Sequence, residues 1–499
     1  MGLARLLSRG QAGLAAYEVI VEVHITGGLP GFAVTGLPAA AVRESKDRVK
    51  AALLTSGHDV PASRITVHLG PADIPKQGGR FDLPIALGVV SATRSQSAAW
   101  ATSRIEFLGE LALNGELRPI TGALPAVLAA RAAGHGLVLP APNLAEAALV
   151  DAEVYTARHL SDVVAHLDGT AALPRVVARK DSEIDDEAPD LGDVRGQGPA
   201  KRALTVAAAG GHNMLMIGPP GSGKSMLAER MRGLLPPLSY DEMLKVASIA
   251  SVAGEASAAR LTRLPPFRAP HHTSSAHALV GGGGRPRPGE ISLAHKGVLF
   301  LDELPEFGRT ALEALREPLE SAVARISRVH EQITFPAEFQ LLAAMNPCPC
   351  GFLGDGTDRC RCSAARLERY RERISGPLLD RFDLHIDVPR VKFDDVADSR
   401  PASESPALRT VVERARSRQL ERSGKLNARL DSRALWRAVD LGAEQRKLLR
   451  RAADHWQLSA RSSVRIVKVA RTIADLADSD SVEVEHVAEA LQLRCRDQA

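Results

Sequence analysis

The residues best suited to chemistry form one short loop. Eight consecutive residues fit the pattern GxxxxGK[ST]: Gly218, Pro219, Pro220, Gly221, Ser222, Gly223, Lys224 and Ser225. In such a loop, glycines let backbone N–H groups turn inward around phosphates, and the N-terminus of the following helix favours negative charge. Lys224 can reach the β- and γ-phosphates, and the Ser225 hydroxyl can ligate Mg²⁺. The pattern therefore predicts a site for ATP and Mg²⁺.

Two acidic residues supply the second part of a hydrolytic site. Asp302 and Glu303 directly follow the apolar run Val298–Leu301. A strand of a parallel sheet would deliver them to the C-terminal edge, where ligands bind. We expect Asp302 to hold Mg²⁺ and Glu303 to orient and deprotonate the attacking water. A strand that merely ends in a charged turn is the alternative.

Three more polar residues could reach the phosphates from the same chain. Asn346 follows the apolar run Phe339–Ala344, which we expect to lie beside the P-loop strand, and could align the water and sense the γ-phosphate. As the residue before Pro347, it could instead belong to a turn. Arg461 and Arg465 begin a C-terminal helical pattern, and either could fold back over the nucleotide. Spacing does not decide between them.

Arg381 has no obvious role within one subunit. It precedes the apolar run Leu384–Val388 on a short segment. If a neighbouring subunit's nucleotide lies opposite, Arg381 could neutralise transition-state charge, an effect worth roughly 10³–10⁵ in rate. A salt bridge to Asp380 or Asp383 is the alternative.

These side chains require parallel strands covered by helices. Asn213–Ile217 is a short apolar strand and Met226–Leu235 has a helical pattern, so the glycine-rich loop joins a strand to a helix. Gly192–Val388 alternates short apolar runs with helical patterns, which predicts an α/β core with a parallel sheet. From Ser405 the pattern is helical almost throughout, ending in Val482–Leu493.

The chain is too long for one hydrophobic core, since it has 499 residues. The N-terminal part reads as mixed α/β, with strands at Val19–Ile25 and Arg64–Leu69 and helices at Ala39–Ser56 and Ala123–Ala133. We expect four regions: an N-terminal domain at residues 1–172, an acidic linker at 173–191, the ATPase core at 192–400 and a helical lid at 401–499.

Composition and charge indicate where the protein is located and what kind of partner it could bind. The formal net charge is only +4, but Ser403–Arg471 holds 17 Lys/Arg against 7 Asp/Glu. A basic C-terminal region suits a polyanion, although a solvated helical face is equally plausible. Met1–Gly10 lacks the apolar core of a signal peptide, and no apolar run is long enough to span a membrane. We therefore expect a cytoplasmic protein.

The cysteines are unevenly spaced. Four of the five fall within 15 residues: Cys348, Cys350, Cys360 and Cys362. Four thiolates could hold Zn²⁺ tetrahedrally, stapling the loop between Asn346 and Arg381. The CxC spacing is tighter than the usual two-residue gap, so buried or loop-forming thiols are an equal alternative. His271 and His272 lack a carboxylate partner with metal spacing, and we expect them to serve loop packing or pore contact.

The segment Val323–Phe335 alternates like a hairpin and carries Arg325, Arg328 and His330. Together with the glycines at Gly281–Gly284 and the nearby Arg285 and Arg287, it could offer a flexible, basic grip on DNA that is indifferent to sequence. A hairpin that faces solvent is the alternative.

Longer motifs occur from one end of the chain to the other. They include Gly28–Phe32, Phe81–Leu87, Arg268–Thr273, Leu315–Glu320, Asn346–Gly351 and Ala470–Leu476. In this order they resemble the ComM (YifB) family of Mg-chelatase-like AAA+ ATPases. The resemblance implies a homo-hexameric ring and, for the competence members, an ATP-driven helicase that branch-migrates DNA in homologous recombination. The family's nucleotide roles fall on Lys224, Ser225, Asp302, Glu303, Asn346 and Arg381, and in related ring helicases a hairpin like Val323–Phe335 lines the pore.

The N-terminal region resembles the Lon-protease-like (ribosomal S5 domain 2-type) α/β domain. A protease of this kind needs a serine activated by a lysine. Alignment on the protease motifs puts Arg80 at the serine position and Leu124, Pro125 and Ala126 where the lysine is expected. We therefore expect a non-proteolytic scaffold for ring assembly or DNA contact.

Two rival functions remain open at this stage. The ATPase subunit of Mg-chelatase drives metal insertion into a porphyrin, but lacks the additional N-terminal domain. A MoxR-like protein would be an ATP-gated remodelling platform. Stimulation of ATP turnover by DNA would separate a DNA motor from both.

Overall fold

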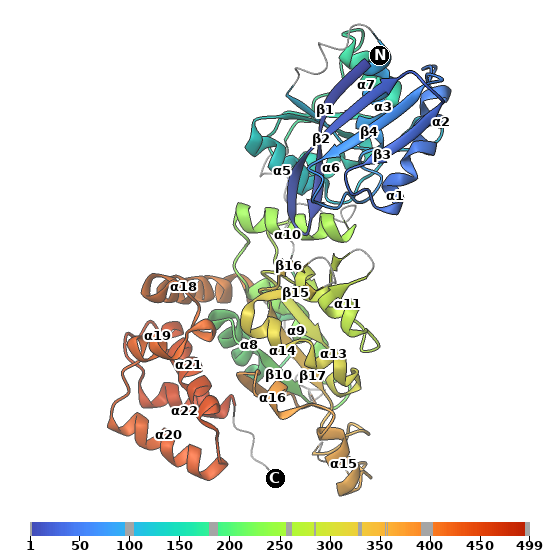
Figure 1. The fold of residues 1–499 in the computed structure, drawn as a ribbon. Coiled ribbons are helices and arrows are strands. Elements are labelled where there is room, and N and C mark those ends of the chain that lie inside the picture. Colours follow the sequence, from blue (N-terminus) through green and yellow to red (C-terminus); the bar gives the residue numbers. More distant parts are fainter. Residues whose placement is uncertain are drawn as a thin grey trace. The chain divides into compact units, whose positions relative to one another are not determined.

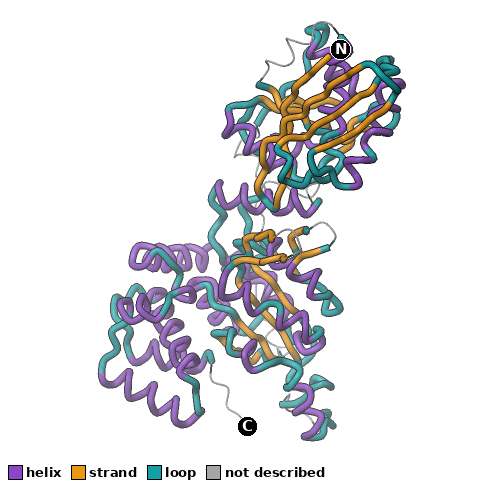
Figure 2. Tube along the Cα trace, in the orientation of Figure 1, coloured by secondary structure: helices purple, strands orange, loops and turns teal. Residues whose placement is uncertain are grey.

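The computed structural model describes residues 2–94, 104–178, 188–255, 262–283, 286–327, 332–354, 356, 358–390 and 403–494. The chain forms two compact units, coloured along the sequence in Figure 1. The first contains Met1–Ile184 and Met243–Leu261, and the second contains Asp185–Glu242 and Thr262–Ala499. Each has a sheet covered by helices, as Figure 2 shows.

A seven-stranded sheet organises the first unit, in the order β3-β4-β2-β1-β5-β8-β9. The strands are β1 (Gly2–Ala12), β2 (Ala15–Thr26), β3 (Gly31–Thr35), β4 (Arg64–Gly70), β5 (Ile105–Phe107), β8 (Gly136–Pro140) and β9 (Val154–Ala157). Val19, Val21 and Val23 alternate into the core of this unit, as period-two strands do. Strand β1 was not predicted; its weak alternation is compensated by pairing with both β2 and β5.

Helices cover this sheet, and a small hairpin, β6 (Glu110–Leu111) with β7 (Leu117–Arg118), adjoins it. The helices are α1 (Ala40–Arg43), α2 (Ser45–Thr55), α3 (Asp82–Thr93), α5 (Ala123–Ala133), α6 (Leu144–Ala147) and α7 (Leu160–Leu167). The predicted helix Ala39–Ser56 is therefore divided into α1 and α2. The predicted helix Ala123–Ala133 is confirmed, ending at Gly134 with a left-handed cap.

Helix α10 (Tyr240–Ala253) begins in the second unit's stretch of chain and continues into Met243–Leu261 of the first. Leu244 joins a buried cluster that includes Leu124 of α5. The Ser251 carbonyl accepts a hydrogen bond from Gly122 N at 3.0 Å. The sequence pattern shows no break at Met243. The segment belongs to the first unit because its residues pack there.

The second unit contains five parallel strands in the order β11-β14-β17-β10-β18. They are β11 (Phe267–Arg268), β14 (Val298–Leu301), β17 (Gln340–Met345), β10 (Met214–Ile217) and β18 (Leu384–Asp387). The expectation of an α/β fold with a parallel sheet is confirmed. Because all strands point the same way, the C-terminal ends of β10, β14 and β17 meet at one edge.

Short helices and two hairpins flank this sheet. The helices are α8 (Gly198–Gly210), α9 (Lys224–Leu234), α11 (Ala276–Val280), α12 (Glu290–Leu293), α13 (Arg309–Glu313), α14 (Arg316–Ser321), α15 (Ala364–Arg371) and α16 (Gly376–Leu379). The hairpins pair β12 (Gly281–Gly282) with β13 (Arg287–Pro288), and β15 (Val323–Ser327) with β16 (Gln332–Pro336).

The C-terminal region is helical, as predicted. Its helices are α18 (Ser405–Ser423), α19 (Ser432–Ala438), α20 (Ala443–Trp456), α21 (Ala460–Leu476) and α22 (Val484–Gln492). Val467 and Ala470 of α21 share one buried cluster with Ala203 and Leu204 of α8. Among the described helices, none is both long and apolar enough to cross a membrane.

Candidate nucleotide site

The glycine-rich loop runs from the end of β10 to the start of α9. Gly221 and Gly223 have φ angles of 74° and 88°, a conformation that side chains other than glycine rarely adopt. A Cβ atom at Gly218 would lie only 2.1 Å from the carbonyl oxygen of Val388. Glycine is therefore required at these positions to keep the loop closely wrapped.

Lys224 is held over this loop. Its Nζ donates hydrogen bonds to the carbonyl oxygens of Gly218 and Pro219 at 2.8 and 2.9 Å, and to Asn346 Oδ1 at 3.4 Å. Burial lowers the pKa of Lys224 below its ordinary value, while the carboxylate of Asp302 acts in the opposite direction. The ammonium group thus occupies the mouth of the loop, where it can meet a phosphate.

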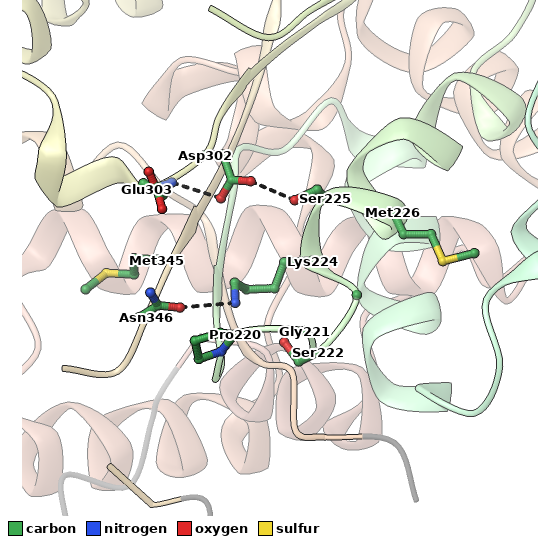
Figure 3. A pocket seen from close by; sticks show the side chains of 11 residues that line it. Pro220, Gly221, Ser222, Lys224, Ser225, Met226, Asp302, Glu303, Met345 and Asn346 are labelled. Atoms are coloured by element: carbon green, nitrogen blue, oxygen red, sulfur yellow. Dashed lines mark hydrogen bonds between the residues drawn. The ribbon is translucent and has the colours of Figure 1, made fainter. Parts of the chain in front are cut away.

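The two acids from β14 lie beside the start of α9 (Figure 3). The Ser225 hydroxyl donates to Asp302 Oδ2 at 2.7 Å, and Glu303 N donates to Asp302 Oδ1 at 2.9 Å. A hydroxyl beside a carboxylate is an oxygen pair of the kind that Mg²⁺ prefers. When bound, Mg²⁺ would neutralise phosphate charge at Ser225 and Asp302.

Glu303 has an unusual backbone. Its φ of 53° is left-handed, which costs a non-glycine residue roughly 1–2 kcal/mol. Such strain clusters at functional sites. Its carboxylate is half-exposed, and Oε2 lies 3.0 Å from Nδ1 of His272. Sequence reasoning missed this contact, because nothing in the spacing brings residue 272 to residue 303.

These groups surround one cavity of about 320 Å³. It is lined by Pro220, Gly221, Ser222, Gly223, Lys224, Ser225, Met226, Asp302, Glu303, Met345 and Asn346. The Ser222 hydroxyl is buried and has no hydrogen-bond partner among the described residues. A cavity with one cation, a carboxylate–hydroxyl pair and a glycine-rich loop fits the triphosphate of ATP as substrate.

Asn346 directly follows β17, whose residues Leu342–Met345 pair with the whole of β10. The prediction that the strand before Asn346 lies beside the strand before the glycine-rich loop is therefore confirmed. The Tyr370 hydroxyl donates to the Asn346 carbonyl at 3.2 Å, and the Asn346 side chain remains directed at Lys224. The amide can contact a phosphate from this position.

Arg381 is buried and forms an ion pair with Glu320 of α14. Its Nη1 also donates to the Pro377 carbonyl at 2.8 Å. The sequence alternative named Asp380 or Asp383 as the intrachain partner, and this was wrong. Asp383 is bound by His212 and Arg465 instead. Helix α14 packs so that Glu320, far away in the sequence, is the carboxylate that contacts Arg381.

The structure distinguishes Arg465 from Arg461. Arg465 Nη1 donates to Asp383 Oδ1 at 2.6 Å, which ties α21 to the end of β18. Arg461 is exposed, and its side chain has no hydrogen bond or ion pair within the described part of the chain. Of the two predicted lid arginines, Arg461 is therefore the one whose guanidinium has no partner among the residues that the structure describes.

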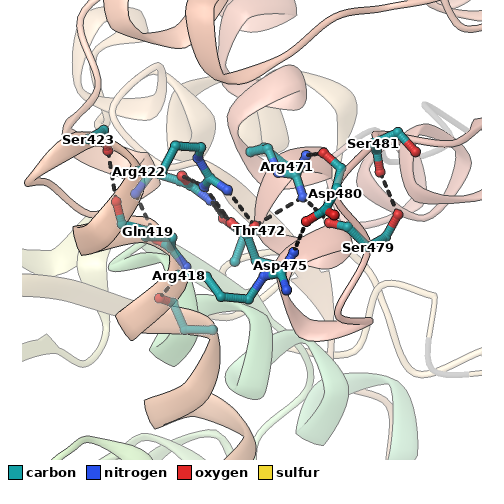
Figure 4. Close-up of polar contacts among 12 residues, drawn as sticks. Arg418, Gln419, Arg422, Ser423, Arg471, Thr472, Asp475, Ser479, Asp480 and Ser481 are labelled. Atoms are coloured by element: carbon teal, nitrogen blue, oxygen red, sulfur yellow. Dashed lines mark hydrogen bonds and ion pairs between the residues drawn. The ribbon is translucent and has the colours of Figure 1, made fainter.

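A buried polar network joins α21 to the parallel-stranded core. His212 donates from Nδ1 to Asp383 Oδ2 at 3.1 Å, and its Nε2 lies 2.8 Å from Thr472 Oγ1. Further along α21, Asp475 accepts two hydrogen bonds from Arg422, each 2.8 Å long (Figure 4). Burial by itself raises the pKa of Asp383, but the hydrogen bond from His212 and the ion pair with Arg465 bring it well below its ordinary value.

The four clustered cysteines converge. Their sulfur atoms all lie within 4.8 Å of one another, and the Cys348 and Cys350 sulfurs lie 3.8 and 3.7 Å from that of Cys360. Tetrahedral thiolate ligation at about 2.3 Å places sulfurs about 3.8 Å apart. The two separations to Cys360 match this spacing and the Cys348–Cys350 separation of 3.3 Å is shorter, so the cluster is a candidate Zn²⁺ site. A Cβ at Gly351 would lie 2.6 Å from the ring of Pro220, so this loop packs directly beneath the phosphate loop.

The predicted basic hairpin forms as β15 and β16. Arg325 Nη1 lies 2.6 Å from Glu317 Oε1 of α14, so an intrachain acid offsets its charge. The other two predicted DNA contacts, Arg328 and His330, lie outside the described residues. A Cβ at Gly281 would meet Ile326 Cδ1 at 2.9 Å, so the two hairpins pack closely.

Arg80 occupies a buried position in the first unit. It donates to Gln11 Oε1 at 2.5 Å and to the Thr121 carbonyl at 2.7 Å, and burial lowers its pKa to about 10. Leu124 and Ala126 are buried in α5 just beyond Thr121. The positions aligned with the protease serine and lysine thus hold an arginine and apolar side chains.

The parallel sheet, phosphate loop and acidic strand end define a P-loop protein of the AAA+ type. Residues 190–396 match the family described as magnesium chelatase, subunit ChlI. Residues 402–494 match the C-terminal region of that subunit, and residues 21–143 match subunit ChlI of Mg-chelatase. Three family models therefore account for the core, the C-terminal helices and much of the first unit.

Similarity to individual proteins extends over the whole chain. The competence protein ComM of Haemophilus influenzae is 47% identical over 99% of this chain and 98% of its own length. A protein of Salmonella typhimurium named YifB is 44% identical over 100% of this chain and 98% of its own length. This chain belongs to the ComM (YifB) family of Mg-chelatase-like AAA+ proteins. More distantly, 41% of the chain is 23% identical to the maternal DNA replication licensing factor mcm6 of Xenopus tropicalis, over 25% of that protein.

Proposed function

We propose that the protein is a Mg²⁺-dependent ATPase that assembles into a hexameric ring in the cytoplasm and moves DNA. Its role would be that of a helicase or branch-migration factor in homologous recombination during natural transformation. The observation that carries the ATPase is the convergence of Lys224, Ser225, Asp302 and Glu303 on one cavity. The DNA role rests on family membership and on the basic hairpin.

Each residue has a definite task in the proposed hydrolysis. Lys224 and the loop N–H groups bind the β- and γ-phosphates, and Ser225 and Asp302 hold Mg²⁺. Glu303 accepts a proton from the attacking water, which Asn346 helps to orient. A positioned base of this kind contributes about 10²–10⁴ in rate.

Arg381 of a neighbouring subunit completes the proposed site. An arginine supplied across an interface stabilises charge on the transferring phosphoryl group. In a single chain Arg381 is paired with Glu320, so ring closure would have to exchange this carboxylate for the neighbour's phosphate. Arg461 would approach the nucleotide from the C-terminal helices.

Two observations support DNA as the partner. The ComM relative is named a competence protein and the distant mcm6 relative a DNA replication licensing factor. The β15–β16 hairpin carries Arg325 in the middle of β15 and, in the sequence between its strands, Arg328 and His330. Basic groups in such a loop grip phosphates without reading sequence.

ATP turnover with branched, forked and duplex DNA tests this proposal. We expect stimulation of turnover, and affinity whose logarithm falls linearly with the logarithm of salt, by about 0.7 per phosphate contact on single strands. Replacing Arg325 and Arg328 by alanine should reduce the slope of log affinity against log salt by the amount expected for about one to two phosphate contacts. It should also abolish the stimulation of ATP turnover by DNA and leave basal turnover unchanged. The matched control replaces Arg5 and Arg64, which lie on strands of the first unit.

Salt-independent or undetectable DNA binding by the assembled ring with ATP would contradict the DNA motor. The hypothesis of a MoxR-like remodelling platform would then be preferred. The Mg-chelatase alternative is favoured by the family descriptions that match the chain, and metal insertion into a porphyrin in place of DNA-stimulated turnover would support it. Wild-type DNA response in the Arg325/Arg328 variant would exclude the hairpin as the grip.

We also propose a structural Zn²⁺ at the four-cysteine cluster. Its proximity to Pro220 and Asn346 would let the metal stiffen the loop beneath the phosphates. The first unit is proposed to be a Lon-protease-like scaffold without proteolytic activity, since it lacks the required serine and lysine.

A further inference from the structure

Helix α15 has one buried side chain, that of Tyr370. The other residues of Ala364–Arg371 are exposed, apart from the half-buried Leu367, and several of them are charged. A helix with so little apolar surface gains little from packing, because hydrophobic stabilisation scales with the apolar area removed from water. A general need to bury α15 therefore does not explain where the Tyr370 side chain lies.

The hydroxyl of Tyr370 holds the backbone of Asn346. It donates a hydrogen bond to the Asn346 carbonyl oxygen at 3.2 Å. That carbonyl belongs to the peptide bond before Pro347, and this peptide bond has no N–H because proline lacks one. The carbonyl oxygen is thus the only polar group through which the peptide can be held in place.

The peptide on the other side of Asn346 is held by the glycine-rich loop. Gly218 N donates to the Met345 carbonyl at 3.2 Å. Peptide units are planar, so fixing the units on both sides of a residue leaves its two backbone dihedral angles little freedom. The backbone in turn sets the direction of the Asn346 amide, whose Oδ1 lies 3.4 Å from Lys224 Nζ (Figure 3).

The chain segment that carries Tyr370 starts from Asn346 itself and returns to it. After Asn346 the chain passes through the four-cysteine cluster, and α15 begins shortly after the last of these cysteines. Within this segment, a Cβ at Gly351 would lie 2.6 Å from the Pro220 ring and 3.8 Å from Asn346 Cγ. The segment therefore contacts the glycine-rich loop as well as the backbone and side chain of Asn346.

We propose that Tyr370 is a positioning residue for ATP hydrolysis that acts through Asn346. By holding the Asn346 carbonyl, it fixes the direction from which the amide meets the γ-phosphate and the attacking water. Without the hydroxyl the amide would spend less time in the productive orientation, and a small misplacement lowers the rate of a reaction that depends on orientation. This inference rests on the proposed ATPase function and deepens it by naming the group that orients one of its residues.

Three variants and their combination separate this role from simple packing. Tyr370→Phe removes the hydroxyl and keeps the buried ring. Tyr155→Phe is the matched control, because it removes a hydroxyl that donates to Glu153 Oε1 at 2.9 Å in the first unit. Asn346→Ala removes the amide on which Tyr370 is proposed to act. The double variant Asn346→Ala/Tyr370→Phe completes a double-mutant cycle.

ATP turnover is measured for each variant as kcat and KM. We expect Tyr370→Phe to lower kcat by about twofold to tenfold, the effect of one hydrogen bond, with little change in KM. The double variant should have the same kcat as Asn346→Ala, because the hydroxyl then has no amide to orient. Tyr155→Phe should turn over ATP like the wild type.

Two results would overturn the proposal. One is wild-type kcat in Tyr370→Phe. The other is an equal loss of kcat from Tyr370→Phe in the wild-type and Asn346→Ala backgrounds, which would show that the tyrosine supports the loop and does not act through the amide.

Failure of the proposed ATPase function has a different signature, since the wild type would then not hydrolyse ATP. Binding of ADP with aluminium fluoride and Mg²⁺, which imitates the transferring phosphoryl group, tests Tyr370 in that case. Several-fold weaker binding to Tyr370→Phe than to the wild type, with equal binding of ADP alone, would uphold the positioning role. Equal binding of the fluoride complex to both proteins would refute it.

Discussion

At the scale of single residues, the site separates binding from chemistry. Lys224 reaches the phosphates and is held by carbonyl groups of its own loop, so its removal affects the nucleotide directly. Among the described residues, Glu303 has no hydrogen bond or ion pair with that loop; its carboxylate extends from a strained left-handed residue at the end of β14. The two side chains can therefore be tested independently.

Lys224→Ala should weaken ATP binding, because the phosphate cation is lost. Glu303→Gln should keep Mg-ATP bound but lower turnover by about 10²–10⁴, because only the base is removed. Nucleotide affinity and single-turnover hydrolysis measure the two effects. Glu306→Gln, three residues away and paired with Arg373, is the control and should turn over normally. Wild-type turnover in Glu303→Gln would refute the assignment of the base.

At the scale of elements, helix α21 is fastened to the parallel-stranded core by buried charges. Asp383 lies between His212 and Arg465, and all three belong to different parts of the chain. A buried ion pair contributes little net stability when complete, but breaking it leaves an uncompensated charge. The position of α21, and with it Arg461, should therefore depend on this carboxylate.

Asp383→Asn should lower the free energy of unfolding of the second unit by about 3–5 kcal/mol. Urea unfolding followed by tryptophan fluorescence reports this, since Trp436 and Trp456 lie on α19 and α20. The control is Asp478→Asn, which breaks an exposed pair with Arg414 and should cost no more than about 1 kcal/mol. Equal effects in the two variants would contradict a special role for the buried pair.

The same carboxylate predicts a pH dependence. The pKa of Asp383 is lower in the folded protein than in the unfolded chain, so its contribution to stability is present above the unfolded value of about 3.9. That contribution is lost as pH falls below this value. The unfolding free energy of the wild type should thus decrease more steeply in acid than that of Asp383→Asn, and parallel curves would refute the assignment.

The cysteine loop is a second element whose chemistry can be measured. Wild-type protein purified without chelators should contain about one zinc per chain, because four thiolates complete a tetrahedral site. Cys360→Ser should lower the zinc content sharply, whereas Cys495→Ser, at the cysteine outside the cluster, should not. Elemental analysis gives the answer, and metal-free wild type would leave the loop as four packed thiols.

At the scale of the whole molecule, the proposed ring requires sites shared between subunits. The parallel sheet supplies the P-loop, acids and Asn346 from one chain, but Arg381 is directed to Glu320 of α14. Helix α14 also holds Arg325 through Glu317. One short helix thus restrains two cations that the proposed ring would present to nucleotide and DNA.

Arg381 should act in trans. Mixing Arg381→Ala subunits with Lys224→Ala subunits should restore part of the hydrolysis that each lacks alone, since some interfaces then pair an intact loop with an intact arginine. Turnover is measured across mixing ratios, with Lys224→Ala mixed into a Lys224→Ala/Arg381→Ala double variant as the control. No recovery in rings shown to mix would assign Arg381 to the intrachain ion pair.

Local sequence patterns were enough to predict several elements of this protein. The pattern GxxxxGK[ST] predicts the loop because glycine can adopt the positive φ angles that such a tight turn needs. The run Val298–Leu301 predicts a buried strand because all four residues are apolar. The acids at residues 302 and 303 follow from that strand's end. The same local logic predicted α5 and its glycine cap, but missed β1, whose pattern is weak and whose pairing comes from two other strands.

The contacts between residues far apart in the sequence depend on how the elements pack. His272 contacts Glu303, Arg381 pairs with Glu320, and Arg465 pairs with Asp383. In each case the two residues lie far apart in the sequence, so their spacing does not predict the contact. Strand order brings β11 beside β14, and helix packing places α14 and α21. Such pairings depend on the closure of long loops and on competition among many charged groups, so no local pattern can specify them.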